Sequence, residues 1–238
     1  MPHAAEEQGR VTVAIPAYNE EATVAAILRS TLAQPLVREA VVVDDGSSDG
    51  TWAAIQAQAR GEPRIKALRH ERNRGKGAAL RTAFAQASSP IVIVQDADLE
   101  YDPADFPALA APIAGGVADI VFGSRFHGDR AWRTSALWHA AGNRLVTAAF
   151  NLCARQRLTD LETGYKAFRR ELLQGITLQE DRFGFDPEIA AKLARLPGAR
   201  LIEVPISYRA RSRAQGKKIR LRDGFTVLRC IFKYGLQA

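Results

Sequence analysis

Val92-Ile93-Val94-Gln95-Asp96-Ala97-Asp98-Leu99-Glu100 is an apolar run that ends in three acidic residues spaced two apart. In an extended backbone alternate side chains point the same way, so the three carboxylates are placed to bring their oxygens to one point. Such oxygens suit a hard divalent cation, which would also relieve their repulsion. A strand followed by a plain acidic turn explains the same residues equally well, because Tyr101-Asp102-Pro103 is typical of turns.

Strand and helix patterns alternate on both sides of this stretch. The apolar runs predict strands at residues 11–15, 41–43, 65–70, 91–95 and 119–122. Helices are predicted between them at residues 20–32, 51–59, 76–87 and 103–114, with Asn19 as the cap of the first. This alternation implies an α/β fold with a mostly parallel central sheet and helices on both faces.

Unusual residues follow each of the first four predicted strands. These segments are Pro16-Ala17-Tyr18-Asn19-Glu20, Asp44-Asp45-Gly46-Ser47, Asn73-Arg74-Gly75-Lys76-Gly77 and the acidic triplet. Ligands of parallel sheets bind beyond the carboxyl ends of the strands, where all four segments fall. Each segment alone also fits a turn or a helix cap, but their coincidence favours one binding cleft.

Length and composition indicate a globular protein with one large core. The chain has 238 residues, 47% of them hydrophobic. Its apolar segments are shorter than the roughly 20 residues that span a bilayer, and its first residues carry no signal-peptide pattern, so we expect a cytoplasmic protein. Cys153 and Cys230 have no metal-site spacing, and we expect both to be buried and reduced, with neither zinc nor a disulfide.

Charge divides the chain into two different halves. Residues 1–124 hold 11 Lys and Arg against 16 Asp and Glu, whereas residues 125–238 hold 22 against 10. The acidic half suits a metal-bound ligand, and the basic half suits an anionic partner such as a phosphate or a membrane surface. A solvated, Arg-rich surface is the plain alternative for most of these residues.

Four motifs together resemble the inverting family 2 glycosyltransferases with the GT-A fold, in particular the dolichol-phosphate mannose synthase and polyprenyl-phosphate glucosyltransferase branch. They are Ile15-Pro16-Ala17-Tyr18-Asn19-Glu20-Glu21, Val43 to Thr51, Asn73 to Gly77, and Asp96-Ala97-Asp98. The resemblance covers roughly residues 10–222. It implies a single GT-A domain over residues 10–238, with a nucleotide-sugar and metal half at residues 10–124 and an acceptor half at residues 125–238.

The resemblance also implies roles for individual residues. Nucleotide binding would fall to Pro16, Tyr18, Glu20, Val43, Asp45, Gly75, Lys76, Asp96, Ala97 and Asp98. Mg²⁺ or Mn²⁺ would be held by Asp96, Asp98 and Glu100. The catalytic residues would be Asp98, Arg125 and Asp160.

Three further segments extend the match into the basic half. Gly123-Ser124-Arg125-Phe126 resembles an element whose arginine faces the phosphates, and residues 159–166 resemble the loop on the donor-sugar side. Residues 211–219 resemble a basic flap over the acceptor phosphate, with Arg211 and Lys217 as donors. Acceptor-phosphate contacts are therefore expected from Arg125, Arg144, Arg211 and Lys217.

The predicted reaction is metal-dependent transfer of a hexose from a UDP- or GDP-sugar to a polyprenyl or dolichyl phosphate. A soluble enzyme of the same fold, acting on a sugar, peptide or small-molecule hydroxyl, is the alternative, and it would need Asp160 or Glu188 as a base. A nucleic-acid-binding module is disfavoured, because the basic half has no interleaved aromatic platform.

Residues 221–236 predict an amphipathic helix. Such a helix fits either packing on the core or a position at the membrane interface, on the inner face of the cell membrane. A separate protein could also anchor the chain to the membrane.

Overall fold

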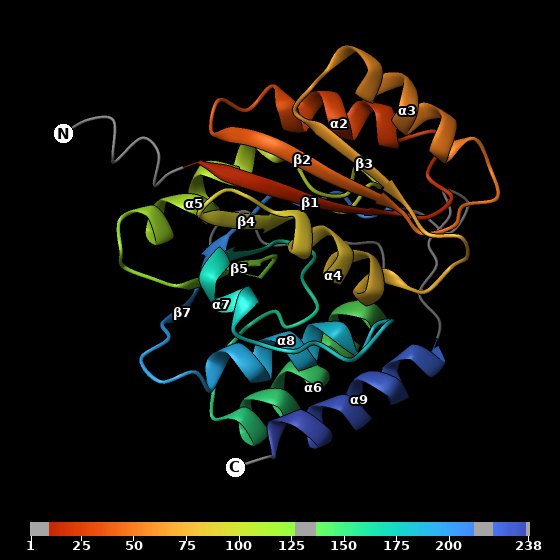
Figure 1. The fold of residues 1–238 in the computed structure, drawn as a ribbon. Helices are drawn as coiled ribbons and strands as arrows, with labels where there is room; N and C mark the ends of the chain where they lie inside the picture. Colours follow the sequence, from red (N-terminus) through yellow and green to blue (C-terminus); the bar gives the residue numbers. More distant parts are fainter. Residues whose placement is uncertain (1–9, 127–136, 212–220, 237–238) are drawn as a thin grey trace.

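The computed structural model describes residues 10–126, 137–211 and 221–236, and Figure 1 shows their arrangement. Seven strands form one sheet in the order β3-β2-β1-β4-β6-β5-β7. The strands are β1 (Val11–Ala17), β2 (Val37–Asp44), β3 (Ile65–Arg69), β4 (Ile91–Val94), β5 (Ile120–Ser124), β6 (Lys166–Arg169) and β7 (Leu201–Pro205). The helices are α2 (Val24–Leu32), α3 (Thr51–Gly61), α4 (Lys76–Gln86), α5 (Phe106–Ala114), α6 (Leu137–Ala154), α7 (Arg170–Gln174), α8 (Phe185–Ala194) and α9 (Leu221–Gly235), with a 3₁₀ turn η1 (Pro103–Asp105).

The sheet is parallel except at one strand. β1 pairs in parallel with β2 and β4, β2 with β3, and β5 with β7. β6 runs antiparallel between β4 and β5. Both halves of the chain therefore share one sheet, and the predicted α/β architecture is confirmed.

Alternating side chains of the central strands feed two separate cores. Val41 and Val43 of β2 pack with α4, α6, α8 and α9 on one face, whereas Val42 packs with α2, α3 and α5 on the other. Successive residues of a strand point to opposite faces, so a run of consecutive valines serves both cores. The face that carries α6, α8 and α9 forms the lower part of the molecule in Figure 1.

The first predicted helix begins later than expected. Asn19 has a positive φ of 51° and does not cap a helix, because α2 starts at Val24 after Thr23. The Asn19 side chain instead accepts a hydrogen bond from the Ser48 backbone N–H, at 3.0 Å. The expected cap is therefore a tie between the loops that follow β1 and β2.

Two helices of the basic half, α6 and α9, lie side by side. α6 and α9 pack on each other, and a Cβ atom added to Gly235 would meet the Cβ of Cys153 at 2.7 Å. Both cysteines are free, with Cys230 buried, whereas Cys153 is only half-buried and so departs from the expectation. Among the described residues no helix has the length and apolarity that crossing a bilayer requires.

Candidate active site

Asp45 organises the loops at the carboxyl end of the sheet. Its buried carboxylate accepts hydrogen bonds from the backbone N–H groups of Arg74, at 3.0 Å, and Gly75, at 2.7 Å. Nδ1 of His70 lies 2.6 Å from the same carboxylate. Asp45 therefore ties the end of β2 to the loop after β3, and this holds the start of α4 in place.

A second tie joins the loops after β1 and β2. The Asn19 backbone N–H donates to Oγ of Ser47 at 2.9 Å, and the Glu20 N–H donates to Oγ1 of Thr51 at 2.8 Å. These contacts bring Pro16, Tyr18 and Glu20 to the edge that Asp45 occupies. Tyr18 is 36% exposed, whereas Val43 is fully buried in the core, so a nucleotide could reach Val43 only through its main chain.

Lys76 and Asp96 form the central ion pair of the cleft. Nζ of Lys76 lies 2.6 Å from Oδ1 of Asp96. Burial works against the charged lysine, but the nearby carboxylates of Asp96, Asp186 and Asp98 outweigh it and raise the pKa of Lys76. The lysine therefore stays cationic at the end of β4, where the sequence predicts a diphosphate.

Gly75 and Gly77 allow this lysine to stand against a second loop. Gly75 has a φ of 106°, and a Cβ atom on it would lie 2.3 Å from the carbonyl oxygen of Asp181. A Cβ on Gly77 would lie 2.2 Å from the carbonyl oxygen of Glu180. The N-terminal turn of α4 thus packs directly on the segment before α8.

The acidic triplet does not meet at one point, and that expectation is wrong. β4 ends at Val94, and Leu99 has a φ of 61°, so the stretch is not extended where alternation was assumed. Among the described residues no three His, Cys, Asp or Glu side chains are grouped to hold a metal ion. Asp96 pairs with Lys76, and Asp98 pairs with Arg211 at 3.0 Å.

Glu100 anchors the segment that follows β7. Its carboxylate accepts hydrogen bonds from the Tyr208 hydroxyl and from the Arg211 backbone N–H, both at 2.8 Å. The Arg211 guanidinium then reaches Glu20 at 2.9 Å and Asp98 at 3.0 Å. Arg211 was expected over the acceptor phosphate, but the structure pairs its guanidinium with Glu20 and Asp98, two residues that were expected to bind the nucleotide.

Arg125 and Asp160 form a buried, two-pronged ion pair. Nε and Nη2 of Arg125 each lie 2.7 Å from a different oxygen of Asp160. Asp160 also accepts from the Arg125 backbone N–H at 3.0 Å and from Nδ2 of Asn143 at 2.7 Å. Four donors satisfy this carboxylate, so its arrangement fits positioning of Arg125 better than proton abstraction.

Glu188, the other candidate base, and Arg144, an expected acceptor contact, have other partners than this pair. Glu188 is fully buried and accepts from the backbone N–H groups of Gln179 and Glu180, at 2.8 and 2.7 Å. Arg144 is exposed on α6 with its guanidinium 5.6 Å from the Phe126 ring centre. Lys217 lies outside the described residues. Glu188 thus ties α8 to the segment before it, and Arg144 stacks on the residue that follows Arg125.

Glu162, Lys166 and Asp186 form a polar cluster that the sequence did not assign. Nζ of the buried Lys166 lies 2.6 Å from Oδ1 of Asp186, at the start of α8. Burial and the Asp186 charge raise the pKa of Glu162 to about 8. Glu162 stands two residues after Asp160 in the same motif. Only the observed contacts distinguish Asp160, whose carboxylate accepts four hydrogen bonds, from Glu162, which has a buried oxygen without a hydrogen-bond partner among the described residues.

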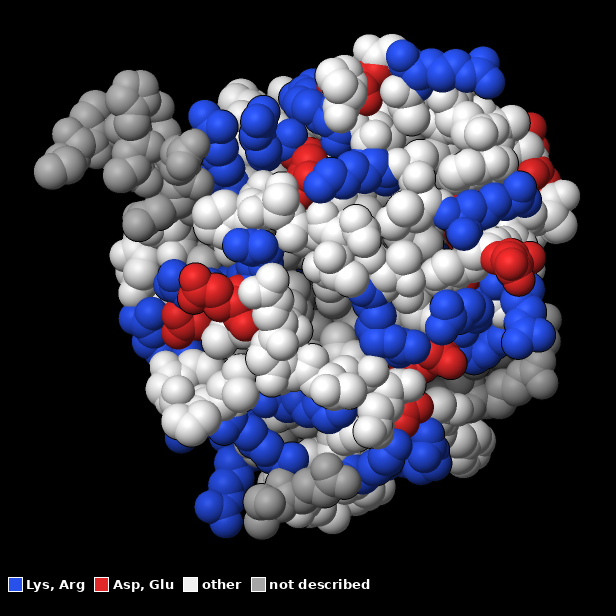
Figure 2. All heavy atoms as spheres, viewed as in Figure 1, with Lys and Arg blue, Asp and Glu red and all other residues white. Residues whose placement is uncertain are grey.

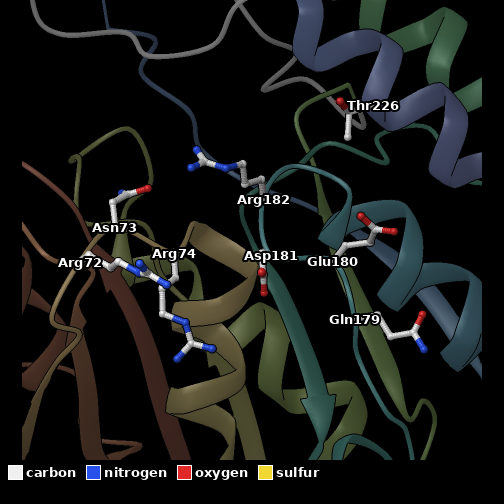
Figure 3. Close-up of a pocket in the computed structure, with 8 residues that line it drawn as sticks. All are labelled: Arg72, Asn73, Arg74, Gln179, Glu180, Asp181, Arg182 and Thr226. Carbon is white, nitrogen blue, oxygen red and sulfur yellow. The ribbon is translucent and has the colours of Figure 1, made fainter.

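A cavity of about 720 Å³ opens beside these loops. Figure 3 shows its lining, with Arg72, Asn73 and Arg74 from the loop after β3 facing Arg182 from the segment before α8. The other lining residues are Gln179, Glu180, Asp181 and Thr226. The cavity therefore borders the loop that Asp45 fixes, on the side toward α9.

Comparison with known proteins agrees with this arrangement of loops. A model of the family described as glycosyl transferase family 2 matches residues 12–177. The chain belongs to glycosyl transferase family 2. The match runs from β1 past β6 and so includes the Asp45, Lys76, Asp96 and Asp160 contacts described above.

Curated family 2 relatives carry names of lipid-phosphate transferases. Undecaprenyl-phosphate 4-deoxy-4-formamido-L-arabinose transferase of Pseudomonas aeruginosa is 33% identical over 212 residues, which are 87% of this chain and 60% of that protein. Dolichol-phosphate mannosyltransferase of Pyrococcus furiosus is 30% identical over 229 residues, which are 94% of this chain and 63% of that protein. The chain thus spans about three fifths of the length of these relatives.

A solved structure confirms the GT-A-like fold. Glucosyl-3-phosphoglycerate synthase from Mycobacterium tuberculosis, in complex with Mn²⁺, UDP-glucose and phosphoglyceric acid, superposes with a TM-score of 0.74 at 25% identity. The superposition covers 98% of this chain and 82% of that one. The family 2 and fold predictions are therefore both confirmed.

The acids of this family 2 cleft have the chemistry that a divalent cation needs. Burial and the negative charges of Asp96 and Glu100 raise the pKa of Asp98 to about 6. An excess of carboxylates in a desolvated site costs free energy unless cations balance it. Asp96 and Asp98 offer the hard oxygen ligands that Mg²⁺ and Mn²⁺ prefer, so the residues present fit such an ion.

Proposed function

We propose that this family 2 glycosyltransferase moves a hexose from a UDP- or GDP-sugar to a polyprenyl or dolichyl phosphate, with Mg²⁺ or Mn²⁺ and with inversion at the anomeric carbon. Relatives named for undecaprenyl phosphate and dolichol phosphate support the acceptor class. A solved neighbour that contains Mn²⁺ and UDP-glucose supports the metal and the donor class.

The observation that carries the lipid acceptor is an apolar surface on two adjacent helices. We call it the α6–α9 surface, and its residues are Leu145, Leu152, Phe225, Phe232 and Leu236. Leu152 is 84% exposed and Phe225 is 76% exposed. On each helix two of these residues stand seven apart, a spacing that places them on one face.

Basic side chains accompany the α6–α9 surface. The side chains of Arg229 and Lys233 on α9 are 59% and 37% exposed. Figure 2 shows Lys and Arg side chains in the lower part of the side of the molecule that is in view, where α8 and α9 lie in Figure 1. Exposed aromatic and aliphatic groups beside cations fit a helix at the interface of an anionic membrane, from which a lipid phosphate can be taken.

The donor end of the proposed site is the Lys76–Asp96–Asp98 group. When bound there, a divalent cation would balance the charge of the departing diphosphate. Nζ of Lys76 is placed to donate to the same diphosphate, and the Arg211 guanidinium stands beside Asp98 as a further donor. Both cations are partly buried, so their interaction with a phosphate is screened less than at an open surface.

The proposed reaction needs no strong base. An oxygen of the acceptor phosphate attacks the anomeric carbon from the face opposite the diphosphate, and the bond between that carbon and the diphosphate oxygen breaks with its electrons leaving on the diphosphate. A phosphate monoester has a second pKa of about 6, so it is largely ionised at neutral pH. The full set of donors on Asp160 supports this reading, because a hydroxyl acceptor would require a carboxylate free to take its proton.

A transfer assay with two labelled donors tests the proposal. Radiolabelled UDP-glucose and GDP-mannose are supplied in parallel with polyprenyl phosphate vesicles, and label is counted in the butanol-extractable lipid. We expect label in the lipid with one donor and its loss in Asp98→Asn. Label in a water-soluble product, with none in lipid, would instead support the soluble hydroxyl or small-molecule acceptor.

A further inference from the structure

Glu162 carries a buried oxygen that lacks a hydrogen bond. Its Oε1 is inaccessible to solvent and has no hydrogen-bond partner among the described residues. Asp160, two residues earlier, is bound by four donors. Leaving a buried polar oxygen unsatisfied is costly, so this position is maintained at the expense of stability.

The charges around Glu162 do not favour its ionised form. Asp186 on α8 and Asp160 on the same loop repel the ionised form, whereas Lys166 on β6 and Arg125 after β5 attract it. Lys166 already pairs with Asp186 at 2.6 Å, and Arg125 already pairs with Asp160 at 2.7 Å. Together with burial, this raises the pKa of Glu162 to about 8, so the group is mostly a neutral acid at pH 7.

The loop of Glu162 touches the donor end of the cleft. A Cβ atom on Gly164 would lie 2.4 Å from Oδ2 of Asp96, and the Gly164 N–H donates to the Tyr101 hydroxyl at 2.8 Å. Asp186 acts on the pKa values of both Glu162 and Lys76. The loop that carries Glu162 therefore borders the donor end of the cleft, and Asp186 links the charge of Glu162 to that of Lys76.

We propose that Glu162 is an acceptor-binding residue whose protonated carboxyl group donates a hydrogen bond to a phosphate oxygen of the acceptor. The inference rests on the proposed function, since it assumes an anionic acceptor. An ionised Glu162 would repel a phosphate dianion, whereas the acid form satisfies both groups. The bond goes to an oxygen other than the attacking one, so no proton is transferred and the bonds that form and break are those of the sugar transfer.

Two substitutions separate this role from that of a general base. Glu162→Ala removes the carboxyl O–H that donates the hydrogen bond. We therefore expect the KM for the lipid-phosphate acceptor to rise by about 10- to 100-fold, the range for a lost hydrogen bond to a charged group. The KM for the nucleotide sugar should not change. Glu162→Gln keeps a neutral N–H donor and should recover most of that loss. Glu171→Gln, on the exposed surface of α7, is the matched control and should behave as the wild type.

The pH profile gives a readout that a merely structural role would not move. The kcat/KM of the wild type for polyprenyl phosphate should fall as pH rises through about 8, because Glu162 loses its proton, and the profile of Glu162→Gln should lack this fall. A wild-type profile that rises through pH 8, or a folded Glu162→Gln as inactive as Glu162→Ala, would overturn the inference.

A melting experiment without substrates checks the neutral carboxyl itself. A folded-state pKa above the unfolded value means that the wild type loses stability as pH rises from about 4.5 to about 8, whereas Glu162→Gln does not. The Tm advantage of Glu162→Gln should therefore grow over this window, and a constant difference would overturn the inference. Failure of the wild type to label lipid with either donor would refute the proposed function itself, and with it the role of Glu162 toward a phosphate.

Discussion

Nη2 of Arg211 lies 3.0 Å from Oδ2 of Asp98, although 113 residues separate the two in sequence. The same guanidinium holds Glu20 at 2.9 Å, so one side chain joins the segment after β7 to the loops after β1 and β4. The charge of Arg211 is therefore on the side of the cleft where we place the donor. The position of Arg211 therefore changes which substrate its substitution should affect.

Arg211→Ala should weaken donor use more than acceptor use. The variant loses a charged hydrogen-bonding group beside the proposed diphosphate position. This loss should raise the KM for the nucleotide sugar by about tenfold or more and leave the KM for the acceptor nearly unchanged. Steady-state kinetics with each substrate varied in turn measures both constants. Arg209→Ala, on an exposed side chain of the same segment, is the control. A larger effect on the acceptor KM would restore the interpretation from the sequence, in which Arg211 belongs to a basic flap over the acceptor phosphate.

Asp98→Ala should remove most turnover without unfolding the protein. A ligand of a catalytic cation typically contributes several kcal/mol to the transition state, so we expect a loss of about 100-fold or more in kcat. EDTA should abolish wild-type activity, and added Mn²⁺ or Mg²⁺ should restore it. Asp102→Ala, in the exposed turn that follows, should stay active. Full turnover of the wild type in excess chelator would rule out metal dependence.

Asp160→Asn should lower the free energy of unfolding, and this loss of stability should accompany any loss of turnover. The change leaves the Arg125 guanidinium, whose side chain is only 11% exposed, without its buried counter-charge. Breaking such a pair lowers the free energy of unfolding by about 3–5 kcal/mol, which urea denaturation can measure. Glu62→Gln breaks the surface pair with Arg64 and should change stability little. An unchanged stability with lost turnover would make Asp160 the base after all.

The α6–α9 surface should bind anionic vesicles in a salt-sensitive way. Each basic residue near such a membrane contributes roughly 1 kcal/mol, and added salt screens this attraction. In liposome flotation, Phe225→Ser/Phe232→Ser should stay with the soluble protein at a salt concentration where the wild type floats. Val117→Ser removes an apolar side chain elsewhere whose exposure lies between those of Phe225 and Phe232, and this variant should float normally. A wild type that never floats would point to a soluble acceptor or to a separate anchoring protein.

The fold was predictable because local patterns determine most of it. Alternating apolar runs and helix periodicities place the first five strands and the four helices between them close to their observed positions. β6 was not predicted, because Lys166–Arg169 is a short segment whose identity depends on antiparallel pairing with β4 and β5. The start of α2 was missed for a different reason, since Asn19 bonds to Ser48 rather than to its own helix.

The candidate site was predictable in its location but less so in its contacts. Parallel strands put Asp45, Lys76 and Asp96 at one edge, and the rule for such sheets places them together. Which carboxylate is satisfied depends on partners distant in sequence, as Asp160 depends on Arg125, 35 residues away. No spacing in the chain distinguishes Asp160 from Glu162 in this respect. The sequence therefore names the motif, and only the contacts assign roles within it.

The reversed direction of β6 has a consequence for how this enzyme could diversify. Because β6 runs against its neighbours, its first residue, Lys166, lies at the edge where β4 and β5 end, and the residues just before it arrive beside Asp96. The loops after β1, β2 and β3 are tied to one another through Asp45, Ser47 and Thr51, and none of these ties involves residues 159–165. We therefore propose that positions of this segment other than Asp160 and Gly164 can change, and with them the proposed contact to the acceptor, while the ties among the other loops stay in place.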